Sequence, residues 1–206
     1  MKFKTDQENF WSGHFGDEYI KRNQNNDLLT SNINFFINAL QRAKEINDCI
    51  EFGANIGMNL KALKIIYPKN EFYAVEINNK ATEHLKNVIS KNNIFEESIL
   101  DFKPKEKWDL VLIKGVLIHI NPDEILKVYN KLFESSKKYL LICEYYSRNP
   151  EELIYRGFKN KLFKRDFAGE MLNLYSNLNL VDYGFVYHKD PKFPQDDITW
   201  FLLEKV

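Results

Sequence analysis

Short apolar runs rich in Ile, Val, Phe and Tyr alternate along this chain with longer windows in which apolar residues recur at helical spacing. This alternation predicts an α/β fold in which a mostly parallel sheet is covered by helices on both faces. The linker between the last two runs, residues 189–197, is too short and too proline-rich for a crossover helix, so those strands should pair antiparallel. The seven expected strands lie near residues 48–52, 71–76, 93–96, 108–113, 138–144, 180–188 and 198–205.

Helices are expected in most intervals between these strands. Residues 30–46 carry apolar side chains at helical spacing, with Ser31 or Asn32 available as the N-cap. A second helix should begin at Asn121-Pro122-Asp123-Glu124, because Asn caps well, Pro suits the first position and acids complement the helix dipole. A third should begin near Asp166.

The first strand leads into a glycine-containing turn. Its sequence reads Glu51-Phe52-Gly53-Ala54-Asn55-Ile56-Gly57, and Glu76 lies about twenty residues further on, at the end of the second strand. Such a turn lets the backbone approach a ligand, and an acid after the next strand accepts hydrogen bonds from ribose hydroxyls. Turn and acid together predict a nucleotide site, whereas the turn alone would fit any α/β protein.

The turn lacks the spacing of dinucleotide-binding proteins, which requires glycines near positions 53, 55 and 58. Asn55 and Met58 stand at two of these positions, which favours a cofactor with an adenosine and no bridging phosphates. The order of acidic strand end, Gly-x-x-x-Gly and Glu resembles class I S-adenosylmethionine-dependent methyltransferases. The resemblance implies a Rossmann-like methyltransferase fold, with S-adenosyl-L-methionine as cofactor and S-adenosyl-L-homocysteine as product.

The resemblance also implies where the cofactor is held. The N–H groups of the turn would face the methionine carboxylate, and Glu51 would orient the amino group directly or through water. Glu76 would hold the ribose, and Ser98 and Ile99 would flank adenine, while Asp101 either recognises adenine or serves as a turn or cap acid. The expected cofactor-binding residues are Tyr19, Arg22, Glu51, Gly53, Ala54, Asn55, Gly57, Glu76, Ile77, Ser98, Ile99, Lys114 and Gly115.

Three residues that follow the fourth and fifth strands are candidates for catalysis, namely His119, Glu144 and Tyr145. An imidazole of near-neutral pKa can take a proton from a hydroxyl or amine acceptor. The alternative is that His119 is a satisfied core or rim residue and that the other two pack at the rim. Methyl transfer need not use a strong base, because in-line positioning of the nucleophile can supply much of the acceleration.

Residues 156–165 form a basic run that contains no acidic residue, and the next acid along the chain is Asp166. Aromatic residues interleave with the charges, and the N-terminus of the helix expected near Asp166 would reinforce an anion site. We therefore expect Arg156, Lys164 and Arg165 to bind a carboxylate or phosphate of the acceptor. A solvated surface run is the alternative interpretation.

The chain also resembles a narrower family, the methylases found with pseudaminic acid biosynthesis. The segments that carry this resemblance are residues 10–19 with Arg22-Asn23, 51–57, 114–122, 162–170 and 193–200. It implies an N-terminal lid in which Tyr19 and Arg22 cover the methionine end and Trp11 or His14 faces the acceptor. The alternative is an N-terminal helix held by aromatic packing. Tyr146, after the fifth strand, is a separate candidate for acceptor contacts.

Composition excludes several classes. Lys plus Arg equals Asp plus Glu at 29 each, so no global field favours nucleic acid or an anionic membrane. The sequence after the fourth strand, Lys114-Gly115-Val116-Leu117, also lacks the proline-rich turn with which DNA amino-methyltransferases grip a flipped base. Cys49 and Cys143 lie in strand-like runs, as expected in a reducing compartment, and the N-terminus lacks the apolar core of a signal peptide. We therefore expect a cytoplasmic protein. The four histidines are scattered along the sequence, so we expect no metal site.

Residues 1–206 are expected to form one domain, with a lid at 1–28, a Rossmann-like core at 29–206 and a basic insertion at 147–165. The expected function is methyl transfer to an oxygen or nitrogen of a small anionic sugar. The resemblance suggests a nonulosonic acid of pseudaminic or legionaminic type, its CMP-activated form or a precursor, for surface glycan or flagellin modification. Alternatives are methylation of another small metabolite or glycan, or a non-catalytic cofactor-binding partner of a glycan-assembly complex. The sequence does not indicate the oligomeric state.

Overall fold

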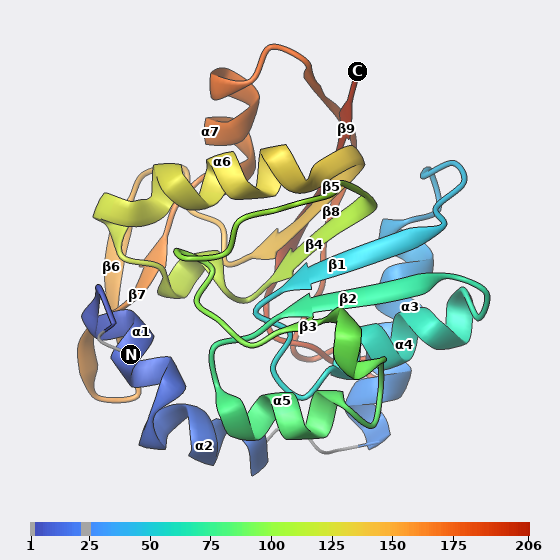
Figure 1. Cartoon of the computed structure of the whole chain (residues 1–206). Helices are drawn as coiled ribbons and strands as arrows, with labels where there is room; N and C mark the ends of the chain where they lie inside the picture. Colours follow the sequence, from blue (N-terminus) through green and yellow to red (C-terminus); the bar gives the residue numbers. More distant parts are fainter. Residues whose placement is uncertain (1–2, 22–25) are drawn as a thin grey trace.

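A seven-stranded sheet forms the centre of the molecule in the computed structural model, which describes residues 3–21 and 26–206, with residues 26 and 27 described by their backbone alone. The strand order is β3-β2-β1-β4-β5-β9-β8, and β9 runs antiparallel to both of its neighbours (Figure 1). The strands are β1 (Asp48–Phe52), β2 (Glu71–Val75), β3 (Ile94–Phe95), β4 (Trp108–Lys114), β5 (Ser136–Glu144), β8 (Leu178–Phe185) and β9 (Thr199–Lys205). The predicted fold class and the antiparallel final pair are therefore confirmed.

Helices cover both faces of the sheet because its strands are apolar on both sides. On one face α3 (Asn26–Ala39), α4 (Met58–Ile66) and α5 (Asn79–Leu85) pack against strand residues such as Cys49 and Leu112. On the other face α6 (Ile125–Ser135) and α7 (Phe167–Leu174) pack against residues such as Ile50 and Val111. Neighbouring residues of one strand thus enter opposite cores, and Figure 1 shows the two helical layers above and below the sheet.

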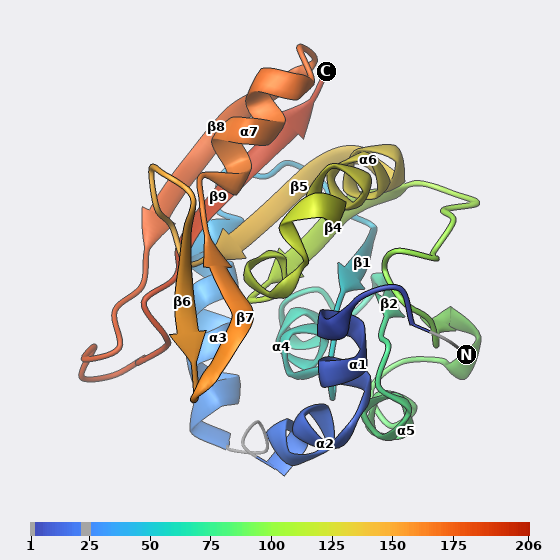
Figure 2. The same cartoon turned by 90° about the vertical axis from the view of Figure 1, so that its left-hand side faces the viewer.

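Two short helices lie apart from these layers, at the end of the sheet toward which β1, β2 and β4 point (Figures 1 and 2). They are α1 (Asp6–Ser12) and α2 (His14–Ile20). A reciprocal capping box starts α1: Glu8 N donates to Thr5 Oγ1 at 3.2 Å, and Thr5 N donates to Glu8 Oε2 at 2.8 Å. The capping box fixes where α1 begins, and the two helices lie over the carboxyl ends of the strands (Figures 1 and 2).

The basic insertion contains a β-hairpin that the sequence analysis did not predict. Its strands, β6 (Glu151–Tyr155) and β7 (Phe158–Lys164), pair with each other and with no strand of the main sheet. Arg156 and Gly157 form the turn with φ of 51° and 87°, the left-handed conformation of tight hairpin turns. The hairpin was missed because most of its residues are exposed and charged residues interrupt both strands, so no apolar period marks them.

Two helix starts were predicted correctly and one was wrong. Asn121 caps a 3₁₀ turn (Pro122–Glu124) that leads into α6, and Asp166 caps α7 by accepting a hydrogen bond from Gly169 N at 2.8 Å. Ser31 and Asn32 do not cap a helix, because α3 begins before them and both are buried inside it. Further 3₁₀ turns are Lys91–Asn93 and Leu117–His119.

Within the described residues, no helix combines the length and the apolar character needed to cross a membrane.

Candidate functional site

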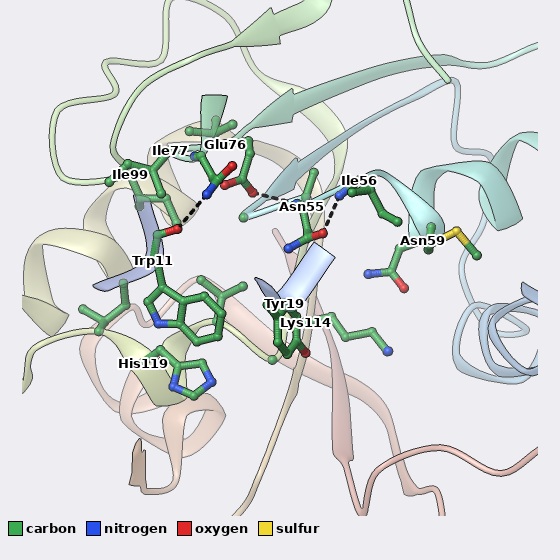
Figure 3. A pocket seen from close by; sticks show the side chains of 18 of the residues that line it. Trp11, Tyr19, Asn55, Ile56, Asn59, Glu76, Ile77, Ile99, Lys114 and His119 are labelled. Atoms are coloured by element: carbon green, nitrogen blue, oxygen red, sulfur yellow. Dashed lines mark hydrogen bonds between the residues drawn. The ribbon is translucent and has the colours of Figure 1, made fainter. Parts of the chain in front are cut away.

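A cavity of about 500 Å³ opens at the carboxyl ends of β1, β2 and β4. The strand order reverses here, between β1 and β4, which is where open α/β sheets bind their ligands. Its walls come from the turn after β1, the ends of β2 and β4, the N-terminal helices and the loop between β8 and β9 (Figure 3). The predicted site residues that line it are Trp11, Tyr19, Gly53, Ala54, Asn55, Glu76, Ile77, Ser98, Ile99, Lys114, Gly115 and His119.

Gly53 is required at the start of the turn for two reasons. Its φ is +75°, in the left-handed region that side chains disfavour. A Cβ atom at this position would also lie 2.6 Å from Val116 Cγ2. The turn after β1 is thus packed directly against the loop that follows β4.

The N–H groups at the start of the turn already have acceptors within the chain. Gly53 and Ala54 donate to the Val75 carbonyl at 2.8 and 3.3 Å, and Asn55 donates to Glu76 Oε2 at 2.6 Å. The expectation that these groups face a cofactor carboxylate is therefore not met in this arrangement. The first turn of α4, which no side chain among the described residues caps, presents N–H groups instead.

Glu76 is fixed at the edge of the cavity by two backbone donors. Its carboxylate accepts hydrogen bonds from Asn55 N at 2.6 Å and Asn78 N at 2.8 Å, and it is buried. Burial raises the pKa of Glu76, although the backbone N–H groups oppose this shift. The carboxylate thus has a set orientation in which to accept ligand hydroxyl groups (Figure 3).

Glu51 lies behind the cavity wall and is only 1% exposed. Its Oε1 accepts a hydrogen bond from Asn59 Nδ2 at 2.6 Å, while Oε2 has no partner among the described residues. Burial raises the pKa of Glu51 to about 8. Asn59 lines the cavity, so its amide separates Glu51 from the cavity.

The cavity wall near β3 is formed by apolar side chains and by one hydroxyl that already has hydrogen-bond partners. Ile77 and Ile99 line the cavity here (Figure 3). The Ser98 hydroxyl donates to Glu8 Oε1 at 2.5 Å and accepts from Leu100 N at 3.1 Å. Ser98 therefore attaches α1 to the sheet. A flat ring bound in this part of the cavity would contact the apolar side chains of Ile77 and Ile99, because the Ser98 hydroxyl already has partners.

The N-terminal helices form the roof of the cavity. Trp11 and Tyr19 line it, and Asn78 Nδ2 donates to Trp11 O at 3.1 Å and to Asp17 Oδ1 at 3.0 Å. A Cβ atom on Gly16 would lie 1.8 Å from the Trp11 carbonyl oxygen, so α1 and α2 meet at a contact that only glycine allows.

Of the other predicted residues of this segment, one lies away from the cavity and the other is not described. His14 is exposed and does not line the cavity, and Arg22 lies outside the described residues. Asp101 forms an ion pair with Lys4, which agrees with its interpretation as a turn residue.

His119 is held in one tautomer. It is 7% exposed, and its Nδ1 lies 2.6 Å from the carbonyl oxygen of Lys161 in the hairpin. Because a carbonyl only accepts, Nδ1 must carry the proton, which leaves Nε2 as the acceptor of the neutral ring. The rings of Trp11 and Tyr155 lie 4.6 and 4.8 Å away, and burial lowers the pKa of His119 to about 4. The ring is therefore neutral at physiological pH.

Glu144 has a different role from the expected catalytic one. It is buried outside the cavity wall, and its carboxylate accepts hydrogen bonds from the N–H groups of residues 116–118 at 3.0, 2.9 and 3.5 Å. Burial raises the pKa of Glu144 to about 7. Its oxygens hold the loop that carries His119, and the side chain does not line the cavity. Tyr145 also lies outside the wall, and burial together with the nearby Asp196 carboxylate raises its pKa.

The basic run does not reach the cavity. Arg156 is exposed at the hairpin turn, Lys164 lies over the Tyr145 ring at 5.5 Å, and Arg165 forms an ion pair with Glu170 at 2.7 Å. Tyr146 is likewise exposed away from it. The hairpin contributes instead through the Lys161 carbonyl and Tyr155, both of which contact His119.

Several lining residues were missed by the sequence analysis, namely Asn32, Asn59, Asn78, Gln195 and Asp196. They come from α3, α4, the loop after β2 and the loop between β8 and β9, where no local motif marks them. Only Gln195 and Asp196 carried a signal, because they lie in a segment of the narrower resemblance. In the described part of the chain, no group of three or more His, Cys, Asp or Glu side chains is arranged to hold a metal ion.

No model of a known protein family matches the sequence, and no curated protein matches it either. Solved structures do match over nearly the whole chain. A magnesium protoporphyrin IX methyltransferase from Synechocystis, solved with bound S-adenosylhomocysteine, has a TM-score of 0.69 and 14% identity, covering 99% of this chain and 100% of its own. The chain has the fold of the methyltransferases.

Two further structures support the same fold. A 1,6-didemethyltoxoflavin-N1-methyltransferase from Burkholderia thailandensis has a TM-score of 0.67 and 11% identity, covering 97% of this chain and 87% of its own. An S-adenosylmethionine-dependent methyltransferase from Clostridium acetobutylicum has a TM-score of 0.64 and 13% identity, covering 93% and 97%. At these identities the likeness concerns the fold alone.

Proposed function

We propose that this protein binds S-adenosylmethionine and transfers its methyl group to an oxygen or nitrogen atom of a small acceptor. The observation that carries the proposal is the cavity at the reversal point of the sheet, in which Glu76 is oriented beside the Gly53 turn. The shared fold supports it, since several similar structures hold S-adenosylmethionine or S-adenosylhomocysteine.

The residues of the cavity fit such a cofactor. Glu76 would accept hydrogen bonds from the ribose hydroxyls, and Ile77 and Ile99 would cover the adenine. The uncapped first turn of α4 would receive the methionine carboxylate, and the unpartnered Oε2 of Glu51 supports a nearby site for the ammonium. Tyr19, on α2, would close this end.

The cofactor supplies a methyl group on a positively charged sulfur, which is already a good electrophile. The chain has to exclude water, align the acceptor and receive its proton. Trp11 and the roof helices cover the cavity, and Nε2 of neutral His119 would receive the proton. A base with a pKa near 4 is weak, so positioning would provide most of the acceleration.

The finer proposal concerns the acceptor, which would be a small anionic sugar of the nonulosonic acid class, its CMP-activated form or a precursor. Support comes from the resemblance to pseudaminic acid-associated methylases. Four of its segments, residues 10–19, 51–57, 114–122 and 193–200, contribute lining residues of the cavity. The similar solved structures act on other acceptors, named as a porphyrin and a toxoflavin, so they do not favour a sugar.

Isothermal titration calorimetry with S-adenosylhomocysteine and with NAD tests the cofactor. We expect the first to bind and the second not to. Glu76→Gln should weaken S-adenosylhomocysteine by about tenfold, because loss of a charged acceptor corresponds to roughly 1.5 kcal/mol or more. The matched control is Glu83→Gln, an exposed acid of α5 outside the cavity wall. Tight NAD binding without S-adenosylhomocysteine binding would overturn the proposal.

Turnover is tested with methyl-labelled S-adenosylmethionine and a panel of nonulosonic acids and their CMP derivatives. Label transfer to one of them supports the finer proposal. Label transfer only to a chemically unrelated acceptor would retain the methyltransferase and reject the sugar.

A further inference from the structure

The cavity extends beyond the end of β4 to a part that we name the distal wall. It is formed by Asn32 of α3, Lys114 at the end of β4, and Gln195 and Asp196 of the loop between β8 and β9. In the sheet, β9 lies on the opposite side of the reversal point from β2, whose end carries Glu76. The distal wall therefore lies away from the strand ends that the proposed function gives to the adenosine.

Gln195 is a buried amide of which one half is unsatisfied. Its Nε2 donates to Asn32 Oδ1 at 3.0 Å, and the two side chains are 7% and 1% exposed. Its Oε1 has no hydrogen-bond partner among the described residues. A buried amide oxygen without a donor destabilises the protein by about 1–3 kcal/mol, so a ligand O–H or N–H would relieve this cost.

Lys114 is the cation of the distal wall. Its Nζ lies over the Phe35 ring at 5.6 Å, and it forms no ion pair within the described residues. Burial lowers the pKa of Lys114, while Glu51 and Asp196 act in the opposite direction from beyond ion-pair distance. The Lys114 side chain is partly exposed, and a bound carboxylate would give its ammonium the direct partner that it lacks.

Asp196 adds a second acceptor to the wall. Its carboxylate lines the cavity near Tyr145, whose pKa is raised by burial and by this neighbouring charge. The distal wall thus combines one cationic donor, Lys114, with the carboxylate of Asp196 and with Gln195, whose Oε1 is buried and unpartnered among the described residues. A ligand that is purely anionic would satisfy Lys114 alone and would be repelled by Asp196.

We propose that the distal wall binds the methyl acceptor and that this acceptor carries a carboxylate, which Lys114 receives, beside a hydroxyl or amino group, which Gln195 and Asp196 receive. The inference rests on the proposed function, because it concerns the part of the cavity left once the cofactor is bound. It moves the anion site from the basic run, which lies outside the cavity, to Lys114.

Calorimetry with defined probes tests this inference on the full chain. S-adenosylhomocysteine is titrated first, and 5′-methylthioadenosine, which lacks its amino-acid part, serves as the comparison. N-acetylneuraminate, a sugar acid with hydroxyl groups beside its carboxylate, is then titrated into protein saturated with S-adenosylhomocysteine. Its methyl ester is the control without the negative charge.

The wild type should bind the acid at least about tenfold more tightly than the ester, the loss expected for one charged hydrogen bond. Lys114→Met should abolish this preference, and Gln195→Leu should weaken the acid by about tenfold. Both variants should bind S-adenosylhomocysteine within about threefold of the wild type, as should Lys69→Met, an exposed control remote from the cavity.

Three results would overturn the inference. One is equal binding of acid and ester, or no binding of the acid at about 10 mM. Another is a preference that survives in Lys114→Met. The third is a loss of S-adenosylhomocysteine but not methylthioadenosine in Lys114→Met, because Lys114 would then hold the methionine carboxylate. A wild type that binds no S-adenosylhomocysteine fails at the first titration, which identifies the proposed function as the cause.

Discussion

The contact between Gly53 and Val116 predicts that a single methyl group will disturb the site in a way that a second substitution can repair. In Gly53→Ala the new Cβ would lie 2.6 Å from Val116 Cγ2 and 3.1 Å from Cγ1, while Val116 Cβ would stay at an ordinary 3.4 Å. The same residue would occupy the left-handed region at φ +75°. Gly53→Ala therefore suffers both overpacking and backbone strain, and other glycines of the chain allow the two effects to be measured apart.

Gly115 and Gly157 isolate the backbone strain from the overpacking. Both have a positive φ, +67° and +87°, and a Cβ on either would meet nothing within 4 Å. Alanine there adds backbone strain alone, about 1–3 kcal/mol, offset by about 0.4–1 kcal/mol from the stiffer unfolded chain. We expect a net loss of about 1 kcal/mol in the free energy of unfolding for each. Gly53→Ala adds an overpacking term of about 1–3 kcal/mol, so its loss should be about 2–4 kcal/mol.

Urea unfolding at 25 °C, followed by circular dichroism, measures these differences. In the cycle with Val116→Ala, the double variant should recover the overpacking term, giving a coupling of at least about 1 kcal/mol. Equal losses for Gly53→Ala and Gly115→Ala would refute the reasoning. So would a coupling near zero, because the Val116 methyl groups would then not be the obstacle.

Three further predictions concern the loop after β4, His119 and the roof helices. Glu144→Ala leaves the N–H groups of residues 116–118 without an acceptor and should lower the free energy of unfolding by about 3 kcal/mol. Glu144→Gln should lower it by only about 1 kcal/mol in the same assay, and equal stability of both variants would argue against the positioning role. The pKa of His119 is lowered to about 4 by burial, so the unfolded chain binds more protons between pH 6.5 and 4, and stability should fall by up to about 3 kcal/mol as the pH falls through this window. Urea midpoints against pH for the wild type and His119→Gln check this, and a parallel decline in both would contradict it. Deletion of residues 1–24 removes Trp11 and Tyr19 from the wall and should weaken S-adenosylhomocysteine by about tenfold in calorimetry, while undiminished affinity in a folded protein would reject the roof as part of the site.

The sequence was a good guide wherever one segment determines its own structure. The seven main strands follow from apolar runs, and the last pair had to be antiparallel because residues 189–197 leave no room for a crossover. Asn121 and Asp166 begin helices because their side chains reach N–H groups two or three residues ahead. Gly53 and Glu76 indicated the position of the cavity, because a parallel sheet brings the ends of successive strands β1 and β2 side by side.

Only the tertiary structure decided which polar groups meet. Gln195 and Asn32 are 163 residues apart, yet they form the buried pair of the distal wall. Lys161 reads as one more charge of a basic run, but its backbone carbonyl sets the tautomer of His119. The sequence suggested Glu144 as a second catalytic base at a strand end, but its carboxylate accepts hydrogen bonds from three backbone N–H groups. Periodicity and caps are local properties of the backbone, whereas hydrogen-bond pairing, burial and the pKa shifts that follow depend on which distant segment lies opposite.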